Sequence, residues 1–190
     1  SKFLKDSNSS TSALQGLVKK GILKIEEVEV GRLGSYNGIV KELPVLSEDQ
    51  EGAYQFIKSN FIEKDVVLLH GVTGSGKTEV YIQLIQDAID RGEQILYLLP
   101  EIALTTQIIV RLQKIFGDSV GVYHSKFNLN ERVELWQNLI KGKASKYKVI
   151  LGARSSLFLP FQNLGLVIVD EEHENTFKQF DPAPRYHGRD

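Results

Sequence analysis

Residues 71–78 read Gly-Val-Thr-Gly-Ser-Gly-Lys-Thr, which is a complete G-x-x-x-x-G-K-[ST] phosphate-binding loop. An apolar run, residues 66–69, comes directly before the loop, and an amphipathic stretch beginning at Glu79 follows it. The motif needs this strand-to-helix setting, because the turn aims backbone N–H groups at phosphate oxygens while the new helix adds its positive end. The sequence therefore predicts an α/β domain that binds a nucleoside triphosphate.

The residue types in the loop match the chemistry of ATP. Glycines allow the tight turn, Lys77 is expected to reach the β- and γ-phosphates, and the Thr78 hydroxyl is expected to bind the Mg²⁺ that accompanies ATP. The predicted nucleotide-binding residues of the loop are Gly71, Thr73, Gly74, Ser75, Gly76, Lys77 and Thr78. Gln50, upstream of the loop, is a candidate for reading adenine, and its alternative role is in a capping box with Ser47.

A second part of the nucleotide site is predicted at Asp170-Glu171-Glu172-His173, which follows the most apolar run of the chain, residues 166–169. Ligands of open parallel sheets bind at the carboxyl ends of strands. We expect Asp170 to hold Mg²⁺ together with Thr78, and Glu171 to be the general base for the attacking water. His173 would couple this site to another ligand. The predicted catalytic set is Lys77, Asp170, Glu171 and His173, and the alternative is a solvated acidic turn.

Apolar runs and helical spacings alternate from Ser47 onward. Strands are predicted at residues 66–69, 95–99, 120–123, 149–151 and 166–169. The buried helix faces between them are predicted to be Tyr81, Leu84, Ile85 and Ala88; then Leu104, Ile108, Leu112 and Ile115; then Val133, Trp136 and Ile140. This alternation predicts a P-loop NTPase fold, an α/β architecture whose parallel sheet carries helices on both faces.

Residues 1–46 have a different pattern. It predicts a helix over 12–20, a strand over 22–30, and either a second strand or a linker over 39–46. This order is compatible with the end of a winged-helix module, and a small packing or linker subdomain is the alternative. The predicted division is therefore 1–46, a winged-helix-like segment or linker, and 47–190, a nucleotide-binding domain.

Composition limits the remaining possibilities. A net charge of −1 gives no overall basic field, so nucleic-acid contact requires a local patch. Cysteine is absent, which excludes disulfides and thiolate zinc sites within these residues. Apolar runs are all far shorter than the roughly 18 residues that a membrane span needs. We therefore expect a cytoplasmic protein without membrane contact. The absence of methionine and of a terminating signal at Asp190 leads us to expect a fragment of a longer chain.

Several segments together resemble the PriA (primosomal protein N′) family of superfamily 2 helicases. They are residues 71–81, Leu-Leu-Pro-Glu-Ile-Ala-Leu-Thr at 98–105, Gly-Ala-Arg-Ser-Ser-Leu-Phe at 152–158, 170–173, and the closing 184–190. Gly188 stands where the family pattern has alanine. The resemblance implies that 47–190 is a RecA-like first helicase lobe truncated at its C-terminal end. It also implies a bacterial, DNA-dependent ATPase and 3′→5′ helicase that acts in replication restart and primosome assembly.

The resemblance also implies partners and cofactors. Single-stranded and forked DNA, other replication-restart proteins and single-strand-binding protein are expected partners, and zinc is expected in the full-length protein outside these residues. Because such motors take transition-state arginines from a second lobe, we expect this chain to bind nucleotide without useful turnover. The alternatives are a non-motor P-loop ATPase, such as a small-molecule kinase, and a nucleotide-dependent switch.

DNA contacts are predicted where motifs reach the carboxyl edge of the sheet and in the aromatic and basic tail. The candidates are Glu101, Thr105, Arg154, Lys178, Arg185 and Tyr186. Alternatives are open for each group. Thr105 could belong to a helix start without a ligand, and Arg154 could pair with Glu101. The tail residues Phe177 and Phe180 could simply pack under the loop.

Overall fold

The structure, a computed structural model, describes residues 16, 17, 20, 38–100, 106–123, 129–179, 186 and 187, with only the backbone for 179, 186 and 187. The chain divides into two compact units, Ser1–Arg32 and Leu33–Asp190. In the first unit Gly16 and Leu17 are helical. The rest of the helix and strand predicted over 12–30 lies outside the described residues, so the winged-helix-like segment stays a prediction. All elements below belong to the second unit.

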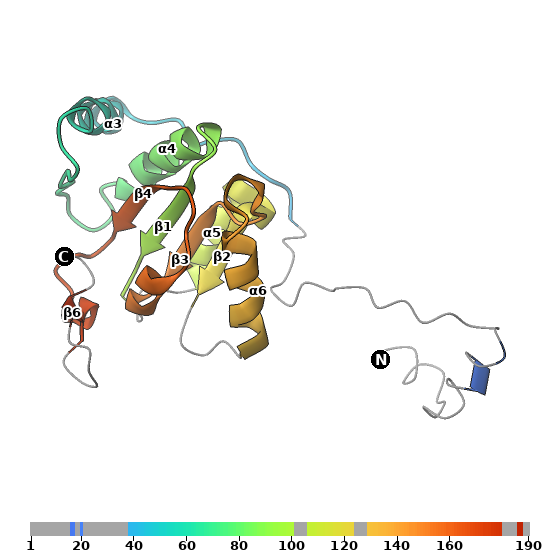
Figure 1. Cartoon of the computed structure of the whole chain (residues 1–190). Helices are drawn as coiled ribbons and strands as arrows, with labels where there is room; N and C mark the ends of the chain where they lie inside the picture. Colours follow the sequence, from blue (N-terminus) through green and yellow to red (C-terminus); the bar gives the residue numbers. More distant parts are fainter. Residues whose placement is uncertain are drawn as a thin grey trace. The chain divides into compact units, whose positions relative to one another are not determined.

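A four-stranded parallel sheet forms the centre of the second unit (Figure 1). Its strands are β1 (Gln94–Leu98), β2 (Val120–Tyr123), β3 (Val149–Gly152) and β4 (Leu164–Val169), in the order β2-β3-β1-β4. In the register, Leu98 of β1 lies opposite both Gly152 and Val169. The strands therefore end level, and the residues after them emerge along one carboxyl edge. The predicted α/β fold with a parallel sheet is confirmed.

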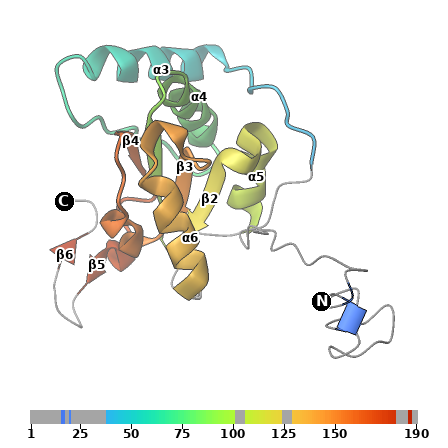
Figure 2. The same cartoon turned by 45° about the vertical axis from the view of Figure 1, so that its right-hand side comes forward.

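Helices cover both faces of the sheet, as predicted. Successive residues of a strand point to opposite faces, so Ile95 and Tyr97 pack with α4 (Lys77–Asp90) and α5 (Thr106–Phe116). Leu96 and Leu98 pack on the other face, with α6 (Leu129–Leu139) and Phe177. The helix α6 can be followed beside the sheet in Figure 2. The predicted face of α4 is confirmed, because Tyr81, Leu84, Ile85 and Ala88 are all buried. In α5, Leu112 is buried and Ile108 and Ile115 pack against the core, whereas Leu104 lies outside the described residues.

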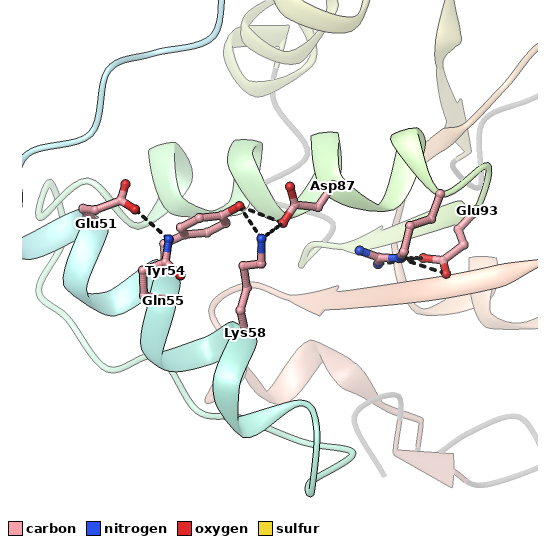
Figure 3. Close-up of polar contacts among 7 residues, drawn as sticks. Glu51, Tyr54, Gln55, Lys58, Asp87 and Glu93 are labelled. Atoms are coloured by element: carbon pink, nitrogen blue, oxygen red, sulfur yellow. Dashed lines mark hydrogen bonds and ion pairs between the residues drawn. The ribbon is translucent and has the colours of Figure 1, made fainter.

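α3 (Glu48–Asn60) packs on α4. It opens with the predicted capping box, in which the Ser47 N–H donates to Gln50 Oε1 at 2.8 Å and the Gln50 N–H donates to Ser47 Oγ at 3.3 Å. Ile57 is buried against α4. Farther along the helix pair, the Lys58 Nζ lies 2.8 Å from Asp87 Oδ2, and the Tyr54 hydroxyl donates to the same oxygen at 2.7 Å (Figure 3). One apolar contact and one polar cluster thus hold α3 in place.

Short elements complete the unit. They are the 3₁₀ turns η1 (Gly117–Ser119), η2 (Gly142–Ala144), η3 (Arg154–Phe158) and η4 (Asn175–Phe177), and the antiparallel pair β5 (Lys178–Gln179) and β6 (Tyr186–His187). Residues 39–46 form no strand, which agrees with the linker of the two alternatives. Within the second unit, residues 39–46 are held in place where the Lys41 N–H donates to the Lys114 carbonyl and Gln83 Nε2 donates to the Pro44 carbonyl. In the described part of the chain, every helix is too short or too polar to cross a membrane.

The prediction of a strand at residues 66–69 was wrong. The segment has no ladder to β4 among the described residues, and Val66 and Leu68 are 82% and 72% exposed. Val67 and Leu69 instead pack against the cluster formed by α3 and α4. An apolar run becomes a strand only where a neighbour supplies backbone partners, and composition does not reveal that neighbour.

The predicted buried face of α6 was also wrong. Val133, Trp136 and Ile140 are 45%, 46% and 50% exposed, whereas Leu135 and Leu139 are completely buried. Both sets have helical spacing and lie on adjacent sides of the same helix, so periodicity alone cannot choose between them. Leu135 and Leu139 form the buried face because they pack with Leu96 and Ile150 of the sheet.

Candidate functional site

The phosphate-binding loop ends where α4 begins. Gly76 is the N-cap of α4, with φ at 85°, and Gly74 has φ at 81°. Both values lie in the left-handed region, which side chains other than glycine rarely adopt. A Cβ on Gly76 would also collide with the side-chain amide of Gln50. The backbone of the loop therefore requires glycine at these two positions.

Lys77 is held inside the loop. Its Nζ donates to the Gly71 carbonyl at 2.6 Å and to the Val72 carbonyl at 3.2 Å. The Ser75 N–H donates to the Val72 carbonyl at 3.1 Å, which closes the turn. A phosphate oxygen is a stronger acceptor for an ammonium group than a neutral carbonyl is. The lysine is therefore placed where an anionic ligand in the loop would attract it.

The acidic group lies at the end of β4. The Asp170 N–H continues the sheet by donating to the Leu98 carbonyl at 3.0 Å. Asp170 Oδ2 accepts from the Tyr97 hydroxyl at 2.9 Å, and Oδ1 accepts from the Glu171 N–H at 3.1 Å. Glu171 has φ at 52° and is the one residue other than glycine with positive φ in the described part of the chain. Such a conformation costs about 1–3 kcal/mol and often accompanies functional sites.

The loop and the acidic group meet at a cavity of about 250 Å³, called the phosphate cavity below. Its lining is Thr73, Gly74, Gly76, Lys77, Thr78, Glu79, Arg111, Asp170 and Glu171. A neighbouring cavity of about 350 Å³ includes His173, whose Nε2 lies 3.6 Å from Glu171 Oε2. The fold thus brings together two motifs that are far apart in the sequence.

Besides Glu79, which also lines the cavity, two residues at this site were not predicted from the sequence. Arg111 of α5 forms an ion pair with Glu79 of α4, and Tyr97 of β1 bonds to Asp170. A signal was present for each. Arg111 follows Ile108 by three residues, which puts a charge beside the buried face of its helix. Tyr97 is the one aromatic residue in a strand whose other apolar residues are Ile95, Leu96 and Leu98.

The two tyrosines on this face of the sheet are kept in their protonated form. Burial, followed by the nearby Asp170 carboxylate and its hydrogen bond, raises the pKa of Tyr97 well above its usual range. Burial, followed by the charges of Asp170 and Glu171, raises the pKa of Tyr81 to about 12. Both hydroxyl groups are therefore protonated at neutral pH, so Tyr97 is a hydrogen-bond donor to Asp170.

The remaining predicted residues have different placements. Gln50 makes its capping bond, and its Nε2 also donates to the Gly76 carbonyl at 3.3 Å, so the side chain touches the loop. Arg154 Nη1 donates to the Thr176 carbonyl at 3.2 Å, and Lys178 is exposed at the start of β5. Glu101, Thr105 and Arg185 lie outside the described residues, as does the side chain of Tyr186.

The tail contributes to the core as well as to the surface. Phe177 is 1% exposed and packs against Leu96, Leu98 and Leu135. It therefore cannot stack on a DNA base, and the packing alternative holds for this residue. Phe180 lies outside the described residues. Among the residues that the structure does describe, no group of three or more His, Asp or Glu side chains forms a metal-binding cluster.

Comparison with known proteins supports this fold. Residues 47–187 match the DEAD/DEAH box helicase family. The replication restart protein PriA of Synechocystis sp. is 42% identical over 188 residues, which is 98% of this chain and 22% of that protein. PriA of Bacillus subtilis is 38% identical over 191 residues, covering 98% of this chain and 23% of the relative. PriA of Rickettsia felis is 45% identical over 148 residues, which is 78% of this chain and 22% of that relative.

The similarity confirms the resemblance to PriA, and it covers less than a quarter of the length of each of these relatives. The helicase match includes both the phosphate-binding loop and the acidic group after β4. With its parallel sheet and the phosphate cavity at the carboxyl edge, the chain belongs to the DEAD/DEAH box helicase family.

Proposed function

We propose that this chain is the ATP-binding part of the first lobe of an ATP-dependent 3′→5′ DNA helicase that acts in replication restart and primosome assembly. The observation that carries the proposal is the phosphate cavity, where Lys77 and Thr78 lie across from Asp170 and Glu171. The names of the PriA relatives support the role in replication restart.

The residues of the cavity fit ATP with Mg²⁺. A Cβ on Gly71 would come within 2.7 Å of Ser75 Oγ, so the Ser75 side chain lies against this glycine inside the loop. Thr78 and Asp170 supply the hydroxyl and carboxylate oxygens that Mg²⁺ prefers. Bound Mg²⁺ would neutralise charge on the phosphates. Among the nucleotide contacts, Gln50 is assigned to adenine, and Thr73 and Ser75 to the phosphates.

The chemistry of the chain's own residues follows from their positions. Lys77 exchanges its bonds to the Gly71 and Val72 carbonyls for the β- and γ-phosphates. Glu171 would accept a proton from the attacking water, and the Asp170 carboxylate would provide an oxygen ligand for the cation. The His173 Nε2 lies 3.6 Å from Glu171 Oε2. This residue would couple the nucleotide site to another ligand bound elsewhere on the lobe. The strained backbone of Glu171 supports a functional role for this residue.

DNA and protein partners belong to the same proposal. Single-stranded and forked DNA would be held by Glu101, Thr105, Arg154, Lys178, Arg185 and Tyr186. The exposed Lys178 at the start of β5 supports a backbone contact there. For the full-length protein we propose zinc, a bacterial cytoplasmic location, and contacts with other restart proteins and single-strand-binding protein. The match to a helicase family disfavours a kinase or a nucleotide switch.

The test is ATP hydrolysis by the full-length parent with and without forked DNA, comparing wild type with Glu171→Gln. We expect strong stimulation by DNA that the substitution abolishes while nucleotide binding persists. Glu174→Gln is the matched control, because Glu174 is a nearby carboxylate that does not line either cavity. Hydrolysis that is indifferent to DNA would overturn the helicase assignment and favour the non-motor ATPase.

A further inference from the structure

Tyr97 is directed at Asp170 by the geometry of the sheet. In the parallel pairing of β1 with β4, Tyr97 lies opposite Ile168. Because side chains of a strand alternate between faces, Ile168 and Asp170 share a face with Tyr97. A tyrosine is long enough to reach along that face to the residue after the end of β4, and the hydroxyl of Tyr97 bonds to Asp170 Oδ2 at 2.9 Å.

The two oxygens of Asp170 are each held by a donor from within the chain. Oδ2 receives the Tyr97 hydroxyl and Oδ1 receives the Glu171 N–H. Two donors at opposite ends of a carboxylate fix its rotation. Since each carboxylate oxygen has about two acceptor positions, both oxygens retain capacity for a cation or its water.

Tyr97 itself has little freedom to move. Its side chain is completely buried, and its ring packs edge-on against Tyr81, with the ring centroids 5.9 Å apart and the ring planes at 79°. Tyr81 belongs to α4, the helix that begins with Lys77 and Thr78. The Tyr97 hydroxyl is therefore fixed with respect to both halves of the phosphate cavity.

We propose that Tyr97 is a positioning residue for the Mg²⁺ that accompanies ATP, because its hydroxyl holds the Asp170 carboxylate in the orientation that the cation requires. This inference rests on the proposed function. Outer partners of metal ligands typically change metal affinity or activity by about 10- to 100-fold when they are removed. We expect an effect near the lower end, because the Glu171 N–H continues to hold one oxygen of Asp170.

The experiment is a Mg²⁺ titration of the binding of a fluorescent ATP analogue to the full-length protein, compared between wild type and Tyr97→Phe. The substitution removes only the hydroxyl and keeps the ring that packs against Tyr81. We expect half-maximal binding at about 10-fold higher Mg²⁺. Binding of the analogue without Mg²⁺ should be unchanged, since the phosphate-binding loop is intact. A loss that was equal with and without Mg²⁺ would indicate a structural defect and overturn the inference.

Tyr147→Phe is the matched control. Tyr147 is also a buried tyrosine, but its Oη has no hydrogen-bond partner among the residues that the structure describes, and it packs in the cluster around α6. Its substitution should leave the Mg²⁺ dependence unchanged. If Tyr97→Phe gave the same Mg²⁺ titration as wild type, the inference would be overturned and the proposed function would be unaffected. If wild type bound the analogue equally with and without Mg²⁺, the proposed function itself would be overturned.

A double-mutant cycle with Asp170→Asn provides a second measurement. If Tyr97 acts through Asp170, the effect of Tyr97→Phe on the Mg²⁺ dependence should disappear once the carboxylate is gone. Thermal unfolding of each variant establishes that the proteins compared are folded. Effects that add independently would show that Tyr97 acts on another group, which would overturn the inference.

Discussion

At the scale of single residues, charge decides how the phosphate cavity receives an anion. Glu79 lines the cavity from the first turn of α4, so its carboxylate repels a bound triphosphate. Arg111 offsets that repulsion through its ion pair with Glu79. We expect Arg111→Ala to weaken ATP binding about 3- to 10-fold, because a partly exposed charge pair contributes on the order of 1 kcal/mol. Calorimetric or fluorescence titration of the Kd for ATP would measure this.

Two variants make that prediction specific. Adding Glu79→Gln to Arg111→Ala should restore part of the affinity, because the uncompensated carboxylate is then gone. Arg91→Ala is the control, since Arg91 forms its own ion pair with Glu93 and lies outside the phosphate cavity. A Kd that Arg111→Ala leaves unchanged at low salt would refute the electrostatic role.

Some site residues could be predicted from the sequence because a local pattern identifies them. Lys77 and Thr78 belong to a local motif, and Asp170 directly follows an apolar run. Tyr97 and Arg111 acquire their roles only from partners brought close by the fold, at sequence separations of 73 and 32 residues. The strands β1, β2, β3 and β4 were predicted because each contains a short apolar run, whereas the equally apolar residues 66–69 form no strand because no described neighbour pairs with them.

At the scale of elements, the orientation of α6 is the point where sequence and structure differ most. Leu135 is buried against the sheet and the Trp136 beside it is 46% exposed. Leu135→Ala should reduce the free energy of unfolding by about 2–5 kcal/mol, since it leaves a cavity in the core. Trp136→Ala should cost clearly less. Urea denaturation compares the two, and a larger loss for Trp136→Ala would mean that α6 presents the face predicted from periodicity.

The contact between α3 and α4 should depend on pH. Burial favours the neutral form of Asp87. Hydrogen bonds from Lys58 and Tyr54 (Figure 3), together with the charges of Lys58 and Arg91, favour the ionised form more strongly. The pKa of Asp87 is therefore lowered below its ordinary value of 3.8. A lowered carboxyl pKa stabilises the folded state above the ordinary value, and this contribution is lost as pH falls through the folded pKa. Asp87→Asn should therefore reduce stability at pH 7 by at most about 1 kcal/mol, and hardly at all near pH 2.

Chemical denaturation of wild type and Asp87→Asn at the two pH values would measure this difference. The hydrogen bonds to Asp87 and Tyr54 raise the pKa of Lys58, so its charge persists across this range and the change belongs to the carboxyl group. Gln55→Ala is a suitable control on α3, the helix that packs against Asp87, because Gln55 contacts only Glu51 among the bonds drawn (Figure 3). An Asp87→Asn effect of equal size at both pH values would contradict the linkage.

At the scale of the whole molecule, the decisive fact is that the chain spans less than a quarter of the length of the PriA relatives compared above. In the proposed function the phosphate cavity supplies residues for binding ATP and activating water, and the one arginine among its described lining residues, Arg111, is paired with Glu79. An arginine that reaches the transferred phosphate can be worth about 10³- to 10⁵-fold in rate. We propose that a second lobe outside these residues supplies it.

We therefore expect the 190-residue chain to bind ATP with a Kd within about 10-fold of the full-length protein, but to hydrolyse it at least about 10³-fold more slowly and without stimulation by DNA. Nucleotide titration and steady-state hydrolysis of both proteins would check the two halves of this prediction. Lys77→Ala is the control that should abolish binding in each. DNA-stimulated turnover by the short chain alone would mean that one lobe contains a complete catalytic site, with Arg111 then the residue to test for contact with the phosphate.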